Sequence, residues 1–310
     1  MAKRISRKTP KASKSPRRKA TRKAPSKPKT PLRRKAKPVK AAKARRAKPK
    51  AKPAPGASAA RAPAKPARAT KAAGVDVVFK ERAAPVAFSG RAAAEARPLK
   101  IVLFGASGNI GSRITSEAVR RGHHVTAVMR NPDRMEFRHA NVRTLRADVT
   151  DPILVATVAR GHDAIISAIA PADDDHDMLA EAASSILQAA RETGIKRIVI
   201  ANGAGSLLVG KGKMLMDTPQ FPAEWRWIAK SHKDALDVLR AKGSDLDWTA
   251  VSPAAMIAPG KRTGKYRLGG DQLMADAKGD SRISMEDFAA ALMDELEQER
   301  YVGKRMSVAY

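Results

Sequence analysis

The chain has 310 residues, 61 Lys and Arg against 30 Asp and Glu, a formal net charge of +31 and no cysteine. The absence of cysteine excludes disulfides, thiolate catalysis and cysteine-ligated zinc. No apolar run approaches the roughly 20 residues that span a bilayer, and no apolar stretch follows the basic N-terminal residues as in a secretory signal. We therefore expect a cytoplasmic protein without a membrane span.

The positive charge is concentrated at the N-terminus. Residues 1–75 hold 28 of the basic residues and no acidic residue, whereas the other 235 residues carry 33 basic and 30 acidic side chains, a net charge of +3. Residues 1–72 consist mainly of Lys, Arg, Ala, Pro and Ser, with too few large apolar side chains to offset the entropy lost on ordering. We expect a disordered tail, followed by a linker over residues 73–98.

The composition of the tail resembles the Lys-Ala-Pro-rich carboxyl-terminal tails of histone H1. Dense positive charge binds phosphates whatever the base sequence, which predicts nonspecific nucleic-acid binding through residues 1–72 and association with the nucleoid. The alternatives are a tether to anionic membrane or polyphosphate, and a solvated tail without a role. A further alternative is a misassigned start codon, with a mature chain that begins nearer residue 73 or 98.

From residue 99 onward, apolar runs alternate with segments of helical spacing. Such alternation is typical of βαβ units on a parallel sheet. The predicted fold class is α/β, a Rossmann-type doubly wound parallel sheet over residues 99–310 with a small C-terminal substrate lobe. Strands are expected at 100–107, 123–130, 141–149, 162–170, 196–205 and 246–253, and helices at 112–122, 178–194, 227–243 and 284–298.

A glycine-rich turn follows the first predicted strand. Gly105 permits a tight turn, Gly108 lets the main chain approach a diphosphate, and Gly111 lets the next helix pack closely on the sheet. Ser107 and Asn109 can add hydrogen-bond donors, and the helix N-terminus favours anions. Between a strand and a helix, this spacing predicts a dinucleotide site; a tight turn without a ligand is the alternative.

Two further positions bear on which dinucleotide binds. The second predicted strand ends at Arg130, where NAD-selective sites carry a carboxylate. A guanidinium there suits a 2′-phosphate, so NADP(H) is favoured over NAD(H), unless Arg130 is only a surface residue. Asp148 and Val149, after the third predicted strand, are placed to border the adenine, although Asp148 is equally suited to a turn.

Several segments together resemble the atypical short-chain dehydrogenase/reductases, closest to the NmrA-like or NADH-flavin reductase type. They include VLFGASGNIGSRI, ADVTD, GAGSL, TGKYRLGGDQL and ISMEDFAAALMDELE, within residues 99–310. The resemblance implies a Rossmann fold, a nicotinamide cofactor and a loop at 202–206 beside the nicotinamide and substrate, where Asn202 replaces the more usual glycine. It maps the cofactor contacts to Gly105, Ser107, Gly108, Asn109, Ile110, Gly111, Arg130, Asp148, Val149, Ala168 and Ile169.

The usual catalytic pair of the wider family, Tyr-x-x-x-Lys, is absent, because none of the three tyrosines has a lysine four residues on. A flavin delocalises the charge of an accepted hydride and does not need that acid. We therefore expect an NAD(P)H-dependent reductase of a flavin or quinone-like acceptor. The alternative is a non-catalytic NADP(H)-sensing regulatory module, held on nucleic acid by the tail; a nucleotide-sugar epimerase or dehydratase is weakened by the missing tyrosine.

Asn202, His232 and Tyr266 are the candidate catalytic residues, with Ser206, Lys230 and Ser252 as further polar groups near the pocket. For His232, we favour a histidine on a helix surface among charged neighbours over a proton donor. Acidic residues at 173–177 precede a helix and suit its positive end better than a metal, so no metal site is expected.

Overall fold

The computed structural model describes residues 97–132, 135, 137–171 and 175–310. The tail predicted over residues 1–72, and all of the predicted linker except its last two residues, lie outside this part of the chain. By its internal contacts the chain divides into two units, Met1–Arg68 and Ala69–Tyr310. All of the described residues lie in the second unit.

An eight-stranded sheet forms the centre of this unit, in the order β3-β2-β1-β4-β5-β6-β10-β8. All neighbouring pairs are parallel except β10 with β8. The strands are β1 (Lys100–Phe104), β2 (His124–Met129), β3 (Val142–Arg146), β4 (Ala164–Ser167), β5 (Arg197–Ala201), β6 (Asp247–Pro253), β8 (Arg267–Gly269) and β10 (Lys304–Ala309).

The strand order reverses between β1 and β4. From β1 the chain moves outward through β2 to β3, then returns to β4 on the other side of β1 and continues to β5 and β6. In open parallel sheets, ligands bind beyond the carboxyl ends of the strands at this reversal. The site is therefore expected where β1 and β4 end.

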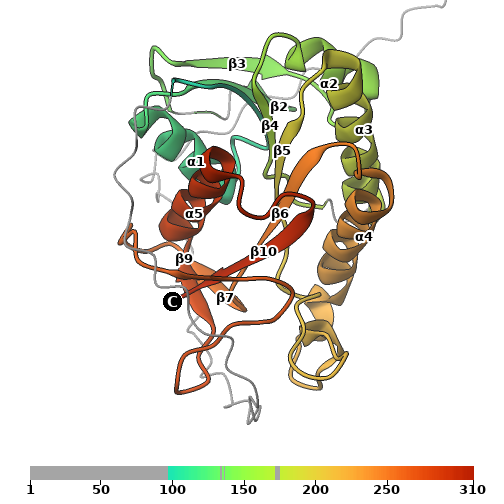
Figure 1. Ribbon diagram of the computed structural model, residues 1–310, viewed down its shortest axis with the longest axis vertical. Coiled ribbons are helices and arrows are strands. Elements are labelled where there is room, and N and C mark those ends of the chain that lie inside the picture. The colour runs from blue at the N-terminus through green and yellow to red at the C-terminus, as the bar shows by residue number, and fades with distance from the viewer. Residues whose placement is uncertain (1–96, 133–134, 136, 172–174) are drawn as a thin grey trace, which may run out of the picture. The chain divides into compact units, whose positions relative to one another are not determined.

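Helices cover both faces of the sheet, as Figure 1 shows. Helices α1 (Asn109–Arg120) and α5 (Met285–Gln298) pack on one face around Ile114 and Phe288. On the other face, helices α2 (Pro152–Ala159), α3 (Met178–Thr193) and α4 (Arg226–Lys242) bury Ile186 and Leu236. Strands buried on both faces read as continuous apolar runs, which explains the pattern that predicted them.

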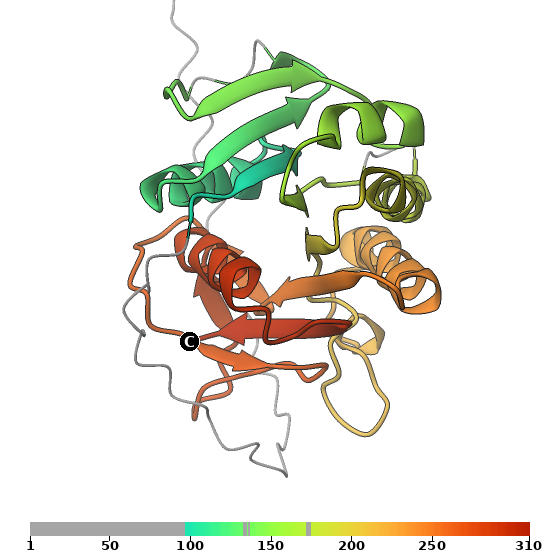
Figure 2. The same ribbon diagram turned by 45° about the horizontal axis from the view of Figure 1, so that its top comes forward.

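The lobe that follows β6 is built from short elements. Strands β7 (Met256–Ala258) and β9 (Arg282–Ser284) form a two-stranded parallel sheet, visible near the C-terminus in Figures 1 and 2. Two 3₁₀ turns, Leu215–Asp217 and Ala223–Trp225, lie between β5 and α4. The predicted fold class, a doubly wound Rossmann-type sheet with a small C-terminal lobe, is confirmed.

The predicted elements differ from the structure at several places. Helix α1 begins at Asn109, inside the glycine-rich turn, rather than at residue 112. Helix α2 and strands β7, β8, β9 and β10 were not predicted. The helix ends at Gly122 and Gly194 are confirmed, since both glycines have the left-handed φ (84° and 76°) that a helix stop favours. Within the described residues, no helix has the length and apolar character needed to cross a bilayer.

Candidate cofactor and acceptor site

The glycine-rich turn lies at the reversal of strand order, and its glycines meet different surroundings. Gly105 has φ 81°, and a Cβ there would stand 2.6 Å from the carbonyl oxygen of Ala168, just past β4. At Gly111 a Cβ would stand 2.1 Å from the carbonyl oxygen of Gly105. These two glycines are required by the fold, because the turn packs tightly against β4 and against α1.

Gly108 has no such requirement. It adopts extended backbone, φ −75° and ψ 169°, as the N-cap of α1. A Cβ there would meet only the Gly105 oxygen at 3.3 Å and the Ala168 oxygen at 4.0 Å, and Ser107, Gly108 and Asn109 are exposed. The open side of this glycine is therefore free for a ligand's close approach.

Among the described residues, no side chain caps the main-chain N–H groups at the N-terminus of α1. Its first turn contains no acidic residue and no side-chain cap, whereas Asp151 accepts from two N–H groups at the start of α2 (2.9 and 3.2 Å). Unsatisfied N–H groups and the helix dipole together favour an anion. The main chain at Asn109, Ile110 and Gly111 thus fits the diphosphate of a dinucleotide.

The next polar group along this edge is Arg130, directly after β2. Its side chain is exposed, and its charge contributes to lowering the pKa of Asp148, after β3. The larger causes of that lowered pKa are the N–H and hydroxyl of Thr150, which donate to the Asp148 carboxylate at 3.0 and 2.8 Å. Asp148 therefore does form the turn that the sequence suggested, while Val149 beside it is partly exposed.

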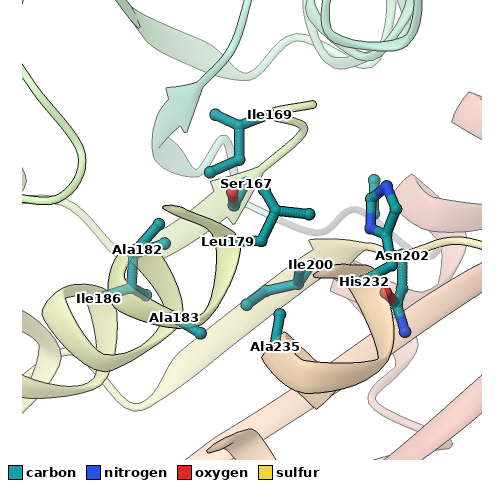
Figure 3. A pocket seen from close by; sticks show the side chains of 11 residues that line it. Ser167, Ile169, Leu179, Ala182, Ala183, Ile186, Ile200, Asn202, His232 and Ala235 are labelled. Carbon is teal, nitrogen blue, oxygen red and sulfur yellow. The ribbon is translucent and has the colours of Figure 1, made fainter. Parts of the chain in front are cut away.

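A small pocket opens beside the ends of β4 and β5, between the sheet and helices α3 and α4 (Figure 3). About 280 Å³ of empty space lies there, and part of it is open solvent at the mouth. Two of its lining residues, Asn202 and His232, lie on one side of it in Figure 3. The others are Ser167, Ile169, Leu179, Ala182, Ala183, Ile186, Ile200, Ala201 and Ala235.

His232 is not the surface histidine that the sequence favoured. It faces the sheet from α4, and a Cβ on Gly203 would come within 3.0–3.2 Å of its side chain. Burial lowers the pKa of His232 from its ordinary value of 6.5 to about 4, so the imidazole is neutral near pH 7. The alternating charged residues around it in the sequence hid this inward direction.

Asn202 follows β5 and is 6% exposed. Its main-chain N–H donates to the Val251 carbonyl of β6 at 2.7 Å. Neither side-chain amide atom has a hydrogen-bond partner in the described part of the chain, and the hydroxyl of the buried Ser252 on β6 has none either. Buried polar groups are nearly always hydrogen-bonded. The unpaired side chains of Asn202 and Ser252 are therefore the most unusual polar groups near the predicted site.

Tyr266 lies elsewhere. Its hydroxyl donates to the Asp294 carboxylate of α5, and burial followed by this bond raises the pKa of Tyr266. It belongs to the core on the α1 and α5 side and does not line the pocket. Ser206 accepts from Arg305 at 2.8 Å, and the exposed Lys230 pairs with Asp234 at 2.5 Å. These three side chains therefore have structural partners.

His176, from the acidic segment before α3, contacts helix α4. The ring of His176 stacks on Trp227 at a centroid distance of 5.0 Å, and Ser231 donates to the His176 carbonyl at 2.8 Å. Asp173 and Asp174 lie outside the described residues. Among those described, no group of three or more His, Asp or Glu side chains is placed to hold a metal ion.

Comparison with known proteins agrees with this geometry. Residues 105–299 match the model of a family described as NAD(P)H-binding. The chain is similar to the uncharacterized protein YwnB of Bacillus subtilis, with 38% identity over 213 residues, which cover 68% of this chain and 98% of that protein. It is also similar to two solved structures.

One of these structures is provisionally named an exported protein from Burkholderia pseudomallei, with 46% identity, a TM-score of 0.63 and coverage of 68% of this chain and 100% of that one. The other is provisionally named an NADH-flavin reductase from Streptococcus pneumoniae, with 34% identity, a TM-score of 0.59 and coverage of 68% and 99%. The chain belongs to the NAD(P)H-binding family, and its domain has the Rossmann fold.

Proposed function

We propose that the chain is an NADPH-dependent reductase whose acceptor is a flavin or a quinone-like ring. The observation that carries this proposal is the glycine-rich turn at the β1/β4 reversal, where α1 begins without a side-chain cap. The pocket lies at the same carboxyl end of the sheet, and no tyrosine is among its lining residues. Bound NADPH supplies a hydride. The chain's own residues hold the dinucleotide, exclude water and leave one side of the ring open to an acceptor.

The polar groups of the pocket support an acceptor that needs no strong acid. An activated tyrosine readily protonates an alkoxide. A neutral imidazole at His232 and an amide at Asn202 are poorer proton donors. Solvent supplies the proton that a reduced flavin or quinone takes up. The apolar walls from α3 suit a flat ring.

Steady-state oxidation of NADPH tests the proposal. The purified chain is mixed with NADPH and, in turn, FMN, FAD, riboflavin and a soluble quinone, and absorbance is followed at the nicotinamide band. We expect acceptor-dependent oxidation well above the rate of the uncatalysed mixture. If the chain binds NADPH and oxidises it with none of these acceptors, the reductase proposal is wrong.

Arg130 supports the preference for NADPH. This exposed residue directly follows β2, where a 2′-phosphate on the adenosine ribose would approach its guanidinium. We predict that Arg130→Ala weakens NADPH binding about 10- to 100-fold and leaves NADH binding within about twofold, because one charge-assisted contact is lost. Calorimetric titration of both dinucleotides measures this, with the exposed Arg160→Ala as the control. An equal loss for both dinucleotides would contradict the assignment.

A second candidate function is a cofactor-sensing module delivered to nucleic acid. The 28 basic residues among residues 1–75, without a single acidic one, favour it. Under this proposal the protein acts at the nucleoid, and NADPH changes the affinity of the full-length chain for DNA. An affinity that is the same with and without saturating NADPH would remove the sensor and leave only a tether.

A further inference from the structure

The unpaired amide of Asn202 is costly for the folded chain. The residue is 6% exposed, and both Oδ1 and Nδ2 lack a partner within the described structure. A buried polar group without a hydrogen bond destabilises a folded protein, because it has lost its bonds to water. Such a cost persists at sites where a ligand later provides the missing bonds.

Asn202 stands at the pocket, although its amide atoms are themselves buried. It immediately follows β5, and it lines the pocket together with Ser167 and Ile169 at the end of β4, the strand next to the glycine turn. The opposite walls are aliphatic, from Leu179, Ile186 and Ile200 (Figure 3). A ligand that enters here meets apolar surface and one amide.

The imidazole beside Asn202 adds no charge to this corner. Burial keeps His232 neutral near pH 7, and the described residues that line the pocket include no Lys, Arg, Asp or Glu. Recognition here therefore depends on uncharged hydrogen bonds. The amide offers one donor and one acceptor side by side, and its complement is a group with an adjacent N–H and C=O.

We infer that Asn202 selects the acceptor by pairing with an imide or lactam edge, an N–H next to a C=O, such as the pyrimidinedione edge of a flavin. This inference rests on the reductase proposal and adds to it the chemical group of the acceptor that Asn202 recognises. The amide atoms have almost no exposed surface in this conformation, so the side chain turns into the pocket on binding. A quinone presents only acceptor oxygens and leaves the Asn202 carbonyl unpaired, and sites built for a hydrogen bond reject ligands that lack the partner.

Two flavins that differ at one atom test this inference. Lumiflavin carries the N3 hydrogen, and 3-methyllumiflavin replaces it with a methyl group. We expect the native full-length chain to reduce lumiflavin with kcat/KM at least about tenfold higher than 3-methyllumiflavin. In Asn202→Leu that ratio falls to about one. Gln188→Leu, which changes an exposed amide on α3, keeps the native ratio.

Binding measurements separate this inference from the reductase proposal. Both flavins are titrated into the complex with NADP⁺, where no turnover occurs, and affinity is measured by flavin fluorescence. Tighter binding of lumiflavin supports the role of Asn202 even if no reduction is seen, in which case the reductase proposal alone fails. Equal affinity and equal kcat/KM for the two flavins in the native chain overturn the inference, whether or not Asn202→Leu folds.

The nicotinamide carboxamide is the competing partner for this amide, since it also has an N–H and a C=O. The affinity of Asn202→Leu for NADPH distinguishes the two. We expect it to stay within about twofold of the native value. A loss for NADPH as large as the loss for lumiflavin would assign Asn202 to the cofactor and overturn the inference.

Discussion

At the scale of single residues, the glycines of the turn serve two different purposes. Gly105 and Gly111 have main-chain oxygens 2.6 and 2.1 Å from the position of a Cβ, whereas the nearest such oxygen at Gly108 is 3.3 Å away. The same sequence motif therefore combines two glycines demanded by packing with one that packing constrains less. Only the structure separates these roles, because the spacing in the sequence treats all three alike.

This difference gives a prediction for Gly108. Gly108→Ala is expected to lower NADPH affinity at least about tenfold, since a methyl group occupies the space of the diphosphate, with a change in the free energy of unfolding below about 1 kcal/mol. Titration with NADPH and urea denaturation measure the two quantities. Gly111→Ala is the matched control and is expected to destabilise the fold by more than about 2 kcal/mol. The assignment of Gly108 to the cofactor fails if its alanine variant binds NADPH normally.

The imidazole of His232, which is partly buried beside the pocket, makes stability depend on pH. Its pKa is about 4 when folded and 6.5 ordinarily. The unfolded chain therefore binds more protons between these values, and the free energy of unfolding decreases as the pH falls through this window. Glu117, whose pKa is held below its ordinary 4.5, loses its stabilising effect only under more acidic conditions.

We predict that His232→Gln reduces the loss of stability between pH 7 and pH 5 by about 1 kcal/mol. Urea denaturation at the two pH values measures the change. His162 also has a pKa lowered chiefly by burial, so the native chain and His162→Gln are needed as references. An unchanged pH dependence in His232→Gln would mean that the imidazole is already solvated in the folded state.

Residue identity alone predicted part of the site. The glycine turn could be found because its spacing encodes a strand, a turn and a helix. The inward direction of His232 could not, because α4 has charged residues on both sides of it, and only packing on Gly203 and the sheet decides which way it points. Asn202 was noticed as a polar residue at a position that usually holds glycine, but its unpaired amide depends on three-dimensional contacts.

At the scale of elements, a buried charge cluster joins α1, α5 and the segment before β8. Glu117 of α1 is 5% exposed and accepts from Arg120, Arg121 and Arg262. Arg121 in turn pairs with Asp294 and Glu297 of α5 at 2.8 Å. Burial alone would raise the pKa of Glu117, but the three guanidinium groups outweigh it and lower the value. The cluster therefore holds the lobe against the helix that begins at the cofactor turn.

Removing the charge of Glu117 should weaken the packing between α1, α5 and the segment before β8. Glu117→Gln is expected to lower the free energy of unfolding by about 2 kcal/mol, because the charge-assisted bonds between the buried carboxylate and three guanidinium groups are lost. Urea denaturation at pH 7 measures this, and Glu192→Gln on the exposed face of α3 should change stability by less than about 0.5 kcal/mol. A similarly small effect at Glu117 would show that water replaces the carboxylate.

Helix α2 and strand β10 were missed because neither has a local sequence pattern that predicts it. Helix α2 has only eight residues, PILVATVA, whose apolar side chains surround it and give no helical periodicity. Two of them, Ile153 and Leu154, remain 72% and 41% exposed. Strand β10 has the polar residues Arg305 and Ser307 buried within it, held by bonds to Ser206 and Gln272. Such tertiary bonds are not visible in a local pattern.

At the scale of the whole molecule, the chain combines a nearly neutral folded part with a polycation. The last 235 residues carry a net charge of only +3, and the other positive charges lie in residues 1–75. Binding to the DNA backbone releases counterions in proportion to the phosphates neutralised, so affinity falls steeply with salt. The sign and density of this charge could be read from the sequence, whereas the structure of these residues lies outside the described part.

This separation predicts that the two activities can be divided by deletion. Full-length protein should bind random duplex DNA with a dissociation constant that rises at least about 100-fold between 50 and 200 mM salt, as expected when several phosphates are neutralised. A chain lacking residues 1–72 should lose this binding and keep its NADPH affinity, because the glycine turn and Arg130 lie in the remaining unit. Fluorescence anisotropy with labelled DNA and calorimetry with NADPH measure the two. Salt-sensitive DNA binding by the shortened chain would instead place the nucleic-acid surface on the Rossmann domain, whose small net charge gives no reason to expect it.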